Sequence, residues 1–181
     1  MKVEETRLSG VLLLTPTIYR DDRGAFMETF NERLMSEVGL PARWVQDNFS
    51  ISKRNVIRGI HYQLTQAQGK LVRVTHGSVW DVVVDLRRHS PGFGQHLAAE
   101  LSGENGRMLW IPVGFGHGFA VLSEQAGFAY KVTDYYSPTG ERTIAWNDPE
   151  LAIPWPVPAE SAIISKKDQK GASFKSAEVF T

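Results

Sequence analysis

The chain contains no cysteine among its 181 residues. Disulfide bonds, thiolate nucleophiles and cysteine-ligated zinc sites are therefore excluded together. Charge of one sign does not prevail either, because 20 basic residues balance 20 acidic ones. Without a net field the chain has no general means of attracting nucleic acid or anionic membranes, although basic side chains can still gather around a phosphate-bearing small molecule.

Long apolar runs are missing as well. The first ten residues, MKVEETRLSG, carry acidic side chains where a signal peptide would become apolar, and the VLLL that follows is short. No stretch approaches the ~20 apolar residues of a membrane span. We therefore expect a cytoplasmic protein with neither a membrane nor a nucleic acid as its partner.

Helical signals are scarce too. Only NERLMSEVG, residues 31–39, is typical of a helix, with Asn31 as its N-cap and Gly39 as its end. The remaining chain consists of short β-branched or aromatic runs between Gly, Pro, Asn and Asp, the pattern of an all-β sandwich, jelly roll or barrel. Because no linker or repeat interrupts it, we expect one domain over residues 1–181, large enough to bury a substantial core.

Two segments predict particular strands. KLVRVTHGSVWDVVVDLR, residues 70–87, predicts a hairpin of two apolar runs around the turn HG. GFAYKVTDYYSP alternates, which places Phe128, Tyr130 and Val132 on one strand face.

The C-terminal segment is different in kind. WNDPELAIPWPVP is rich in proline and cannot supply central strands, so we expect the tail to wrap the barrel. Asp168, in the SKKD beyond it, has to fold back to reach any site in the barrel.

Two motifs resemble those of a cupin. PVGFGHGF has the Pro-x-Gly-x-x-His spacing of the second cupin motif, at Pro112, Gly114 and His117. The first motif usually holds His-x-His, then Glu and, after six residues, Gly; its positions are taken here by His61, Gln63, Lys70 and Gly77. The resemblance implies an all-β, cupin-like jelly roll (a double-stranded β-helix) with a few short helices.

Lys70 stands where a metal-binding cupin has a carboxylate. An ammonium group has no electron pair for a divalent cation and repels one across a narrow site. The sequence therefore predicts a cavity with no metal and no cofactor, in which a fixed lysine stabilises developing negative charge in place of a Lewis acid. The alternative is an ordinary surface lysine; Val72 and Val74 share its strand face, so Lys70 points inward if they do.

Motifs along nearly the whole chain, from RDDRGAFMETF to SKKD, resemble the dTDP-4-dehydrorhamnose 3,5-epimerase family. Between these ends the chain has QDNFSIS, VIRGIHYQ, QGKLVRVTHGSVWDVVVDLR, SPGFG, LWIPVGFGHGF, YKVTDYY and WNDPELAIPW, in this order. The resemblance implies an isomerase of dTDP-rhamnose biosynthesis, metal-independent, that inverts C3 and C5 of dTDP-4-dehydro-6-deoxyglucose. The C4 ketone acidifies the protons on these carbons, so inversion through an enolate needs a base on one ring face and an acid on the other.

The resemblance also assigns catalytic roles. The base is His61 and its orienting carboxylate is Asp168; the proton donor is Tyr130; Lys70 holds O4 as its charge grows. Imidazole suits the base because it titrates near neutrality. The structural alternatives are a core histidine, a solvated tail aspartate and an aromatic residue of the barrel wall. His117 is either a remnant of the cupin motif or a second group that polarises O4.

Substrate binding is assigned by the same resemblance. Arg23, Phe26 and Glu28 lie at the nucleotide, and in the family this region completes the partner subunit's site, which implies a homodimer. Glu141 also matches a substrate-binding position of the family. Gln46 and Asn48 share a strand face and suit the sugar or the pyrophosphate, and the other expected substrate-binding residues are Asp47, Arg58, His117 and Lys167. As ordinary structure, these would be solvated turn and loop residues.

Arg58 requires a particular backbone. In a straight strand it faces away from His61, but Gly59 between them permits a bulge that turns both side chains inward. An arginine fork suits a diphosphate, and Lys167 adds positive charge there.

Three other functions compete with this assignment. A metal-dependent cupin oxygenase or isomerase needs a full ligand set, which HYQ and Lys70 do not provide. A non-catalytic sugar-binding cupin needs no acid and base together, so His61, Tyr130 and Asp168 count against it. A relative that inverts a single carbon of a related dTDP-keto-deoxysugar stays open.

Overall fold

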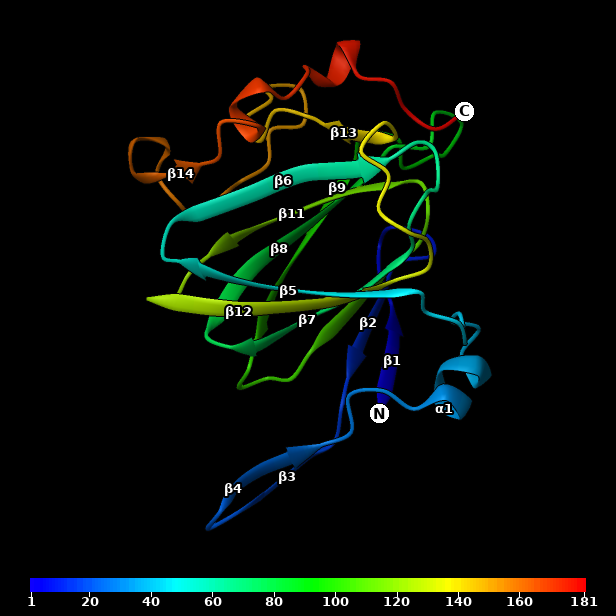
Figure 1. Cartoon of the computed structure of the whole chain (residues 1–181), viewed down its shortest axis with the longest axis vertical. Helices are drawn as coiled ribbons and strands as arrows, with labels where there is room; N and C mark the ends of the chain where they lie inside the picture. The colour runs from blue at the N-terminus through cyan, green and yellow to red at the C-terminus, as the bar shows by residue number, and fades with distance from the viewer.

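The computed structural model describes residues 1–181, and most of its strands form two facing sheets (Figure 1). The first sheet has the order β1 (Lys2–Glu5), β2 (Leu12–Thr15), β10 (Met108–Ile111), β7 (Lys70–His76), β12 (Gln125–Val132) and β5 (Gln46–Lys53). The second has the order β13 (Glu141–Thr143), β6 (Val56–Gln63), β11 (Phe115–Val121), β8 (Ser78–Asp85) and β9 (His96–Ser102), with β14 (Ile163–Ile164) parallel to β6. The predicted all-β, cupin-like jelly roll is confirmed.

The core lies between the two sheets, because alternate side chains of each sheet point inward. Val72 and Val74 of β7 and Phe128 of β12 pack with Val83 of β8 and Phe119 of β11. Phe119 and Phe128 stack with ring centroids 4.2 Å apart. Burying an apolar side chain of this size is worth roughly 1.5–3 kcal/mol, so these inward rows hold the sheets together. The predicted shared face of Phe128, Tyr130 and Val132 is confirmed, because Phe128 and Tyr130 pack in this core and Val132 is buried.

The predicted hairpin over residues 70–87 is wrong. β7 pairs with β10 and β12, whereas β8 pairs with β9 and β11, so the chain crosses between the sheets at Gly77. Gly77 has a φ of 71°, and a Cβ there would lie 2.1 Å from the carbonyl oxygen of Gln125. The chain does turn at HG, but the two strands then enter opposite sheets. Facing sheets bury the inward apolar residues of both strands, whereas a local hairpin of the two strands would leave those residues exposed.

The helix predicted over residues 31–39 is confirmed as α1 (Glu32–Glu37). The Asn31 side chain accepts a backbone N–H from the first turn at 3.3 Å, and Gly39 follows the last turn with a φ of 75°. No helix of the chain has the length and hydropathy needed to cross a membrane. Before α1, β3 (Ile18–Asp21) and β4 (Gly24–Met27) form a separate two-stranded hairpin that projects from the body (Figure 1).

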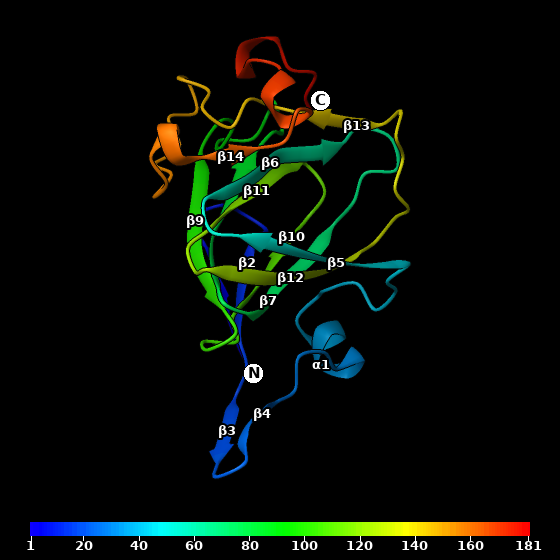
Figure 2. The ribbon, with the colours of Figure 1, turned by 60° about the vertical axis from the view of Figure 1, so that its left-hand side comes forward.

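The C-terminal tail runs along the outside of β6, in orange to red in Figure 2. The tail contains three short 3-10 helices. η1 (Ala159–Ser161) precedes β14, and η2 (Asp168–Lys170) and η3 (Phe174–Ser176) follow it. Ala177 and Val179 pack with Ile60 and other buried residues of the second sheet. The tail is thereby held against the strand that carries His61.

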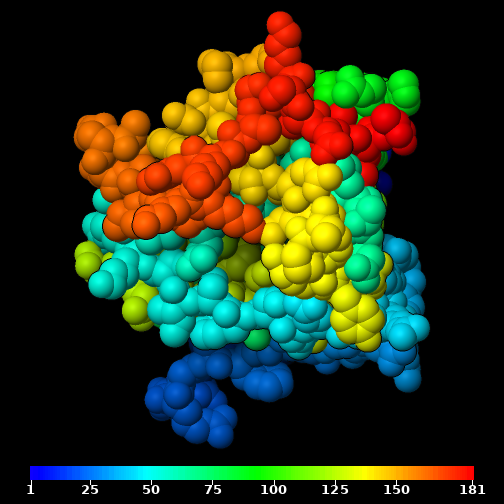
Figure 3. Space-filling model, turned by 45° about the horizontal axis from the view of Figure 1, so that its top comes forward, coloured from blue at the N-terminus to red at the C-terminus, as the bar shows by residue number.

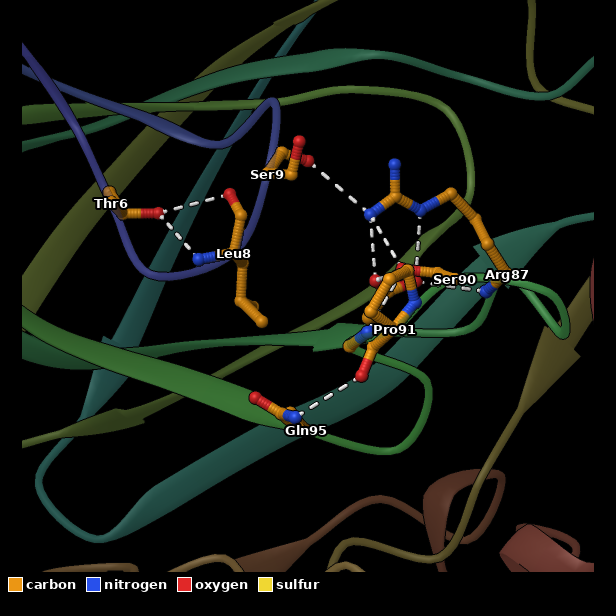
Figure 4. A network of polar contacts seen from close by, with 9 residues as sticks. Thr6, Leu8, Ser9, Arg87, Ser90, Pro91 and Gln95 are labelled. Atoms are coloured by element: carbon orange, nitrogen blue, oxygen red, sulfur yellow. Dashed lines mark hydrogen bonds and ion pairs between the residues drawn. The ribbon is translucent and has the colours of Figure 1, made fainter.

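A polar network joins the N-terminal turn to the loop after β8 (Figure 4). Arg87 contacts the Asp85 carboxylate at 2.7 Å and donates to the carbonyl of Ser9 at 3.3 Å. The Ser90 hydroxyl donates to the same carboxylate at 2.6 Å. None of these residues lines the cavity described next, so the network serves to fix the loops at this end of the barrel.

Candidate active site

A cavity of about 300 Å³ opens between the two sheets, beside β5 and β6. Figure 3 looks onto this side: a recess with an olive floor lies between the cyan atoms of β5 and β6, yellow atoms of the segment around residues 130–140 and orange atoms of the tail. Seven of the predicted site residues line the cavity: Asn48, Arg58, His61, Lys70, His117, Tyr130 and Glu141.

His61 and Asp168 form a close pair. Nε2 of His61 lies 2.6 Å from Oδ1 of Asp168, the first residue of η2. The backbone N–H of Asp168 donates to Oγ of Ser165 at 3.0 Å, which helps to hold the carboxylate in place. Burial raises the pKa of Asp168, but the hydrogen bond and the charge of His61 lower it by more, so the pKa of Asp168 lies below its usual range. An ionised carboxylate at Nε2 favours the tautomer that leaves Nδ1 as the basic nitrogen.

His117 has a carboxylate of its own. Its Nε2 lies 2.9 Å from Oδ2 of Asp81, and its ring stacks on Phe128 with centroids 5.8 Å apart. Asp81 is fully buried on the inward face of β8, between Val79 and Val83. Sequence reasoning missed Asp81; the signal was a carboxylate in the middle of the apolar run VWDVVVD.

Lys70 begins β7 and points into the cavity with only 9% of its surface exposed. The inward orientation inferred from Val72 and Val74 is therefore confirmed, since both valines are buried as well. Burial lowers the pKa of Lys70 to about 8, while the negative charges of Glu141 and Asp81 act in the opposite direction. Lys70 can thus present a desolvated positive charge inside the cavity.

The bulge predicted at Gly59 is confirmed. His61 pairs with His117 and Arg58 with Phe119, so two residues of β6 lie opposite one residue of β11. A Cβ on Gly59 would lie 2.5 Å from the Cα of Gly118, so only glycine fits at this position without a clash. Because of this bulge Arg58 and His61 both line the cavity.

Tyr130 faces the same cavity from β12. Burial raises the pKa of its hydroxyl, an effect that the positive charge of Arg58 counters and the negative charge of Glu141 reinforces. A tyrosine with a raised pKa stays protonated at neutral pH and can donate a proton. Arg58 itself donates from Nε to Oγ of Ser52 at 3.1 Å.

Glu141 joins two other segments at the rim of the cavity. Its carboxylate accepts the hydroxyl of Tyr136 at 2.7 Å and pairs with the ammonium of Lys167. Burial raises the pKa of Glu141, but the hydrogen bonds from Lys167 and Tyr136 outweigh it, and the pKa is lowered. Lys167 and Asp168 are consecutive, so the tail meets the cavity with two charged contacts.

Gln63 and Lys70 occupy the positions of two cupin metal ligands. The Gln63 amide donates to the carbonyls of Gln66 and Tyr135 and accepts the backbone N–H of Ser137. Gln63 therefore holds the loop beside the cavity. No group of three or more His, Asp and Glu side chains in the chain comes together as a metal site would require.

Other predicted residues lie away from the cavity of their own chain. Arg23 pairs with Asp21 at 2.5 Å, and the side chain of Phe26 is exposed on the β3–β4 hairpin. Glu28 follows that hairpin and accepts from Asn31 at 3.2 Å.

Along β5 the predicted residues separate by face. Asn48 lines the cavity, and Gln46 donates to its side chain at 2.8 Å. Asp47, predicted to bind substrate with them, instead points to the outer face and pairs with Lys131 at 2.9 Å, because successive side chains of a strand alternate.

Comparison with known proteins gives one family. A family profile described as dTDP-4-dehydrorhamnose 3,5-epimerase matches residues 5–176. A protein of that name from Pseudomonas aeruginosa is 52% identical over 99% of both chains.

Solved structures agree with this match. The chain is similar to a dTDP-6-deoxy-D-glucose-3,5-epimerase from Legionella pneumophila in complex with dTDP-4-keto-L-rhamnose, with a TM-score of 0.93, 48% identity and coverage of 98% and 94% of the two chains. A dTDP-4-dehydrorhamnose 3,5-epimerase from Bacillus anthracis with TDP and PPi bound has a TM-score of 0.91, 43% identity and coverage of 95% and 98%. On its sequence and its fold alike, this chain belongs to the dTDP-4-dehydrorhamnose 3,5-epimerase family.

Proposed function

We propose that this chain is an isomerase that inverts C3 and C5 of dTDP-4-dehydro-6-deoxyglucose and produces dTDP-4-dehydrorhamnose for rhamnose biosynthesis. One observation carries the proposal beyond family membership. A carboxylate-bound histidine, a protonated tyrosine and a buried lysine line one cavity between the sheets. These are the three kinds of group that an enolate mechanism needs.

His61 is the proposed base. Asp168 holds its ring through Nε2, so Nδ1 accepts the proton from C3 or C5 of the sugar. The positive charge that the imidazole gains is stabilised by the ionised carboxylate 2.6 Å away. The alternative for His61 was a core histidine bonded to the backbone. Its side chain is 30% exposed and its partner is a carboxylate, and both observations count against that alternative.

Tyr130 is the proposed acid. It reaches the cavity from β12 in the first sheet, whereas His61 reaches it from β6 in the second, so a sugar ring between the sheets has the two groups on different sides. Lys70 stabilises the charge on O4 between the two proton transfers. A preorganised charge at a water-excluded oxyanion is commonly one of the largest contributions to catalysis.

We extend the proposal to the nucleotide. Arg58, Asn48 and Glu141 line the cavity, and Lys167 pairs with Glu141; these side chains provide contacts for the sugar and the diphosphate. Tyr136 and Lys167 both contact the Glu141 carboxylate. A bound diphosphate would compete with Glu141 for the ammonium of Lys167.

A homodimer is part of the same proposal. Arg23, Phe26 and Glu28 do not line the cavity of their own chain, and the β3–β4 hairpin that Glu28 follows projects from the body (Figure 1). Tyr19 and Phe26 on this hairpin are 64% and 70% exposed, an apolar pair that another protein surface would cover. Insertion into a second copy's site brings these residues to its nucleotide.

We also propose that the reaction needs no metal. Lys70 supplies the positive charge that a Lewis acid would provide at O4, and Gln63 is engaged by backbone groups. The cytoplasmic location expected from the sequence stays a prediction.

The experiment that tests the function is turnover of dTDP-4-dehydro-6-deoxyglucose in deuterated water, followed by NMR of positions 3 and 5. We expect deuterium at both carbons and the inverted product from the wild-type chain, and neither from His61→Asn. Deuterium at a single carbon would identify a single-carbon epimerase instead. Binding of dTDP without any exchange would identify a non-catalytic cupin.

A further inference from the structure

Asp81 is a fully buried carboxylate that the family assignment leaves without a role. Its exposed fraction is 0%, and it lies on the inward face of β8 between two valines. Oδ2 contacts Nε2 of His117 at 2.9 Å, but Oδ1 has no hydrogen-bond partner. A buried carboxylate costs several kcal/mol of desolvation unless nearby positive charge compensates it.

Two cavity residues act on the charge of Asp81: His117, which contacts it directly, and Lys70. Lys70 is itself buried at 9% exposure and lies on the facing sheet, with the negative charge of Asp81 acting on it. With Lys70 as an ammonium and Asp81 as a carboxylate, the two buried charges balance. Without Asp81, the ammonium would be an uncompensated positive charge in a dry interior.

The cavity contains further groups that act on Lys70. Its other titratable lining residues are Arg58, His61, Tyr62, His117, Tyr130, Tyr136 and Glu141. Glu141 is the other anion among the groups around Lys70, but it lies at the rim and shares its charge with Lys167. Arg58 opposes an ammonium at Lys70. Asp81, by contrast, is fully buried, and the cavity residues that act on its charge are His117 and Lys70.

We propose that Asp81 is a positioning residue: the buried counter-ion that keeps Lys70 in its ammonium form and fixes the ring of His117. The link to catalysis rests on the proposed function, in which an ammonium at Lys70 stabilises O4. The charge arrangement itself belongs to the free protein and holds without substrate. The competing arrangement, also without net charge, has Asp81 as a neutral carboxylic acid and Lys70 as a neutral amine. Burial favours it by raising the pKa of Asp81, whereas the charges of His117 and Lys70 oppose it.

The test is an NMR titration of the substrate-free protein labelled with ¹³C-lysine. The Cε signal of Lys70 is assigned as the one missing from Lys70→Met. Asp81→Asn, nearly the same shape without the charge, should move the Lys70 midpoint down by roughly one pH unit or more, the shift expected when a close opposite charge is removed. Asp85→Asn removes another buried carboxylate from the same strand, one that pairs with Arg87 outside the cavity, and should leave the midpoint in place. An equal midpoint in wild type and Asp81→Asn would overturn the proposal.

A measurement on the wild-type chain covers the case in which Asp81→Asn does not fold. The ¹³Cγ shift of Asp81 should be that of a carboxylate at pH 7, and a carboxylic acid there would overturn the proposal. Kinetics then test the link to catalysis: in Asp81→Asn the alkaline limb of kcat/KM should move to lower pH together with the Lys70 midpoint. A wild-type chain that shows the titrations but no epimerase activity would reject the proposed function and leave the counter-ion role standing.

Discussion

His61 of β6 and His117 of β11 lie directly opposite each other on paired strands, and each is bonded to its own carboxylate. The partner of His61 is Asp168 from the tail at 2.6 Å; the partner of His117 is Asp81 from β8 at 2.9 Å. The side chain of His61 is 30% exposed and that of His117 is 9% exposed. We infer a division of labour in which the accessible pair exchanges protons with the sugar while the buried pair contributes fixed charge and shape.

Replacing Tyr130 by phenylalanine should separate proton removal from inversion. Enolate formation needs only the base, so Tyr130→Phe should still incorporate solvent deuterium at position 3 or 5. The inverted product should fall by ~10²–10⁴-fold, the usual contribution of a general acid. NMR of the sugar measures both, and circular dichroism checks the fold. Inverted product at the wild-type rate would make Tyr130 only part of the barrel wall.

Replacing Arg58 by alanine should weaken binding of dTDP. Loss of a charge-assisted contact to the diphosphate costs roughly 1.5–3 kcal/mol, or about 10–150-fold in Kd. The control is Arg54→Ala, which removes an exposed arginine paired with Glu124 next to the same strand. Calorimetry should give wild-type affinity for the control, and the same affinity for Arg58→Ala would place the diphosphate elsewhere.

The pair of Asp168 and His61 should stabilise the fold in a pH-dependent way. The folded-state pKa of Asp168 is lowered, because the bond to His61 outweighs burial. Its contribution is therefore complete above the unfolded pKa of about 4 and is lost as the pH falls through the folded-state pKa. Urea unfolding should show wild type more stable than Asp168→Asn at neutral pH, with the difference shrinking below about pH 4. A constant difference down to pH 2 would contradict this.

Activity should fall on the alkaline side as Lys70 loses its proton. Burial lowers the pKa of Lys70 to about 8, and the form that stabilises an oxyanion is the ammonium below that pH. Burial raises the pKa of Tyr130, so the tyrosine stays protonated over the same range. We expect kcat/KM to decline by about tenfold per pH unit above about pH 8. A profile that stays flat to pH 10 would show that Lys70 carries no essential charge.

Chelation should leave the activity intact. Purified protein dialysed against EDTA should retain its full rate, because an ammonium at Lys70 takes the place of a Lewis acid. Elemental analysis of the same sample should find no stoichiometric transition metal. Lost activity that returns with one added divalent metal would reject the proposed mechanism.

Local features were predictable because short segments carry them. The cap at Asn31, the alternation around Tyr130 and the bulge at Gly59 each depend on a few neighbouring residues, and each forms as the sequence indicates. The inward orientation of Lys70 followed in the same way from Val72 and Val74. Period and turn chemistry specify which face a side chain occupies.

Only the tertiary structure decided which elements meet. β7 and β8 are consecutive yet belong to opposite sheets, and Asp81 meets His117 through pairing of β8 with β11. Asp168 reaches His61 across 107 residues of chain. Such partners are set by burial of apolar faces between sheets, a sum over many distant contacts that no local pattern contains. The sequence by itself determined the strands and the chemical character of their faces, whereas folding decided which carboxylate stands behind which histidine.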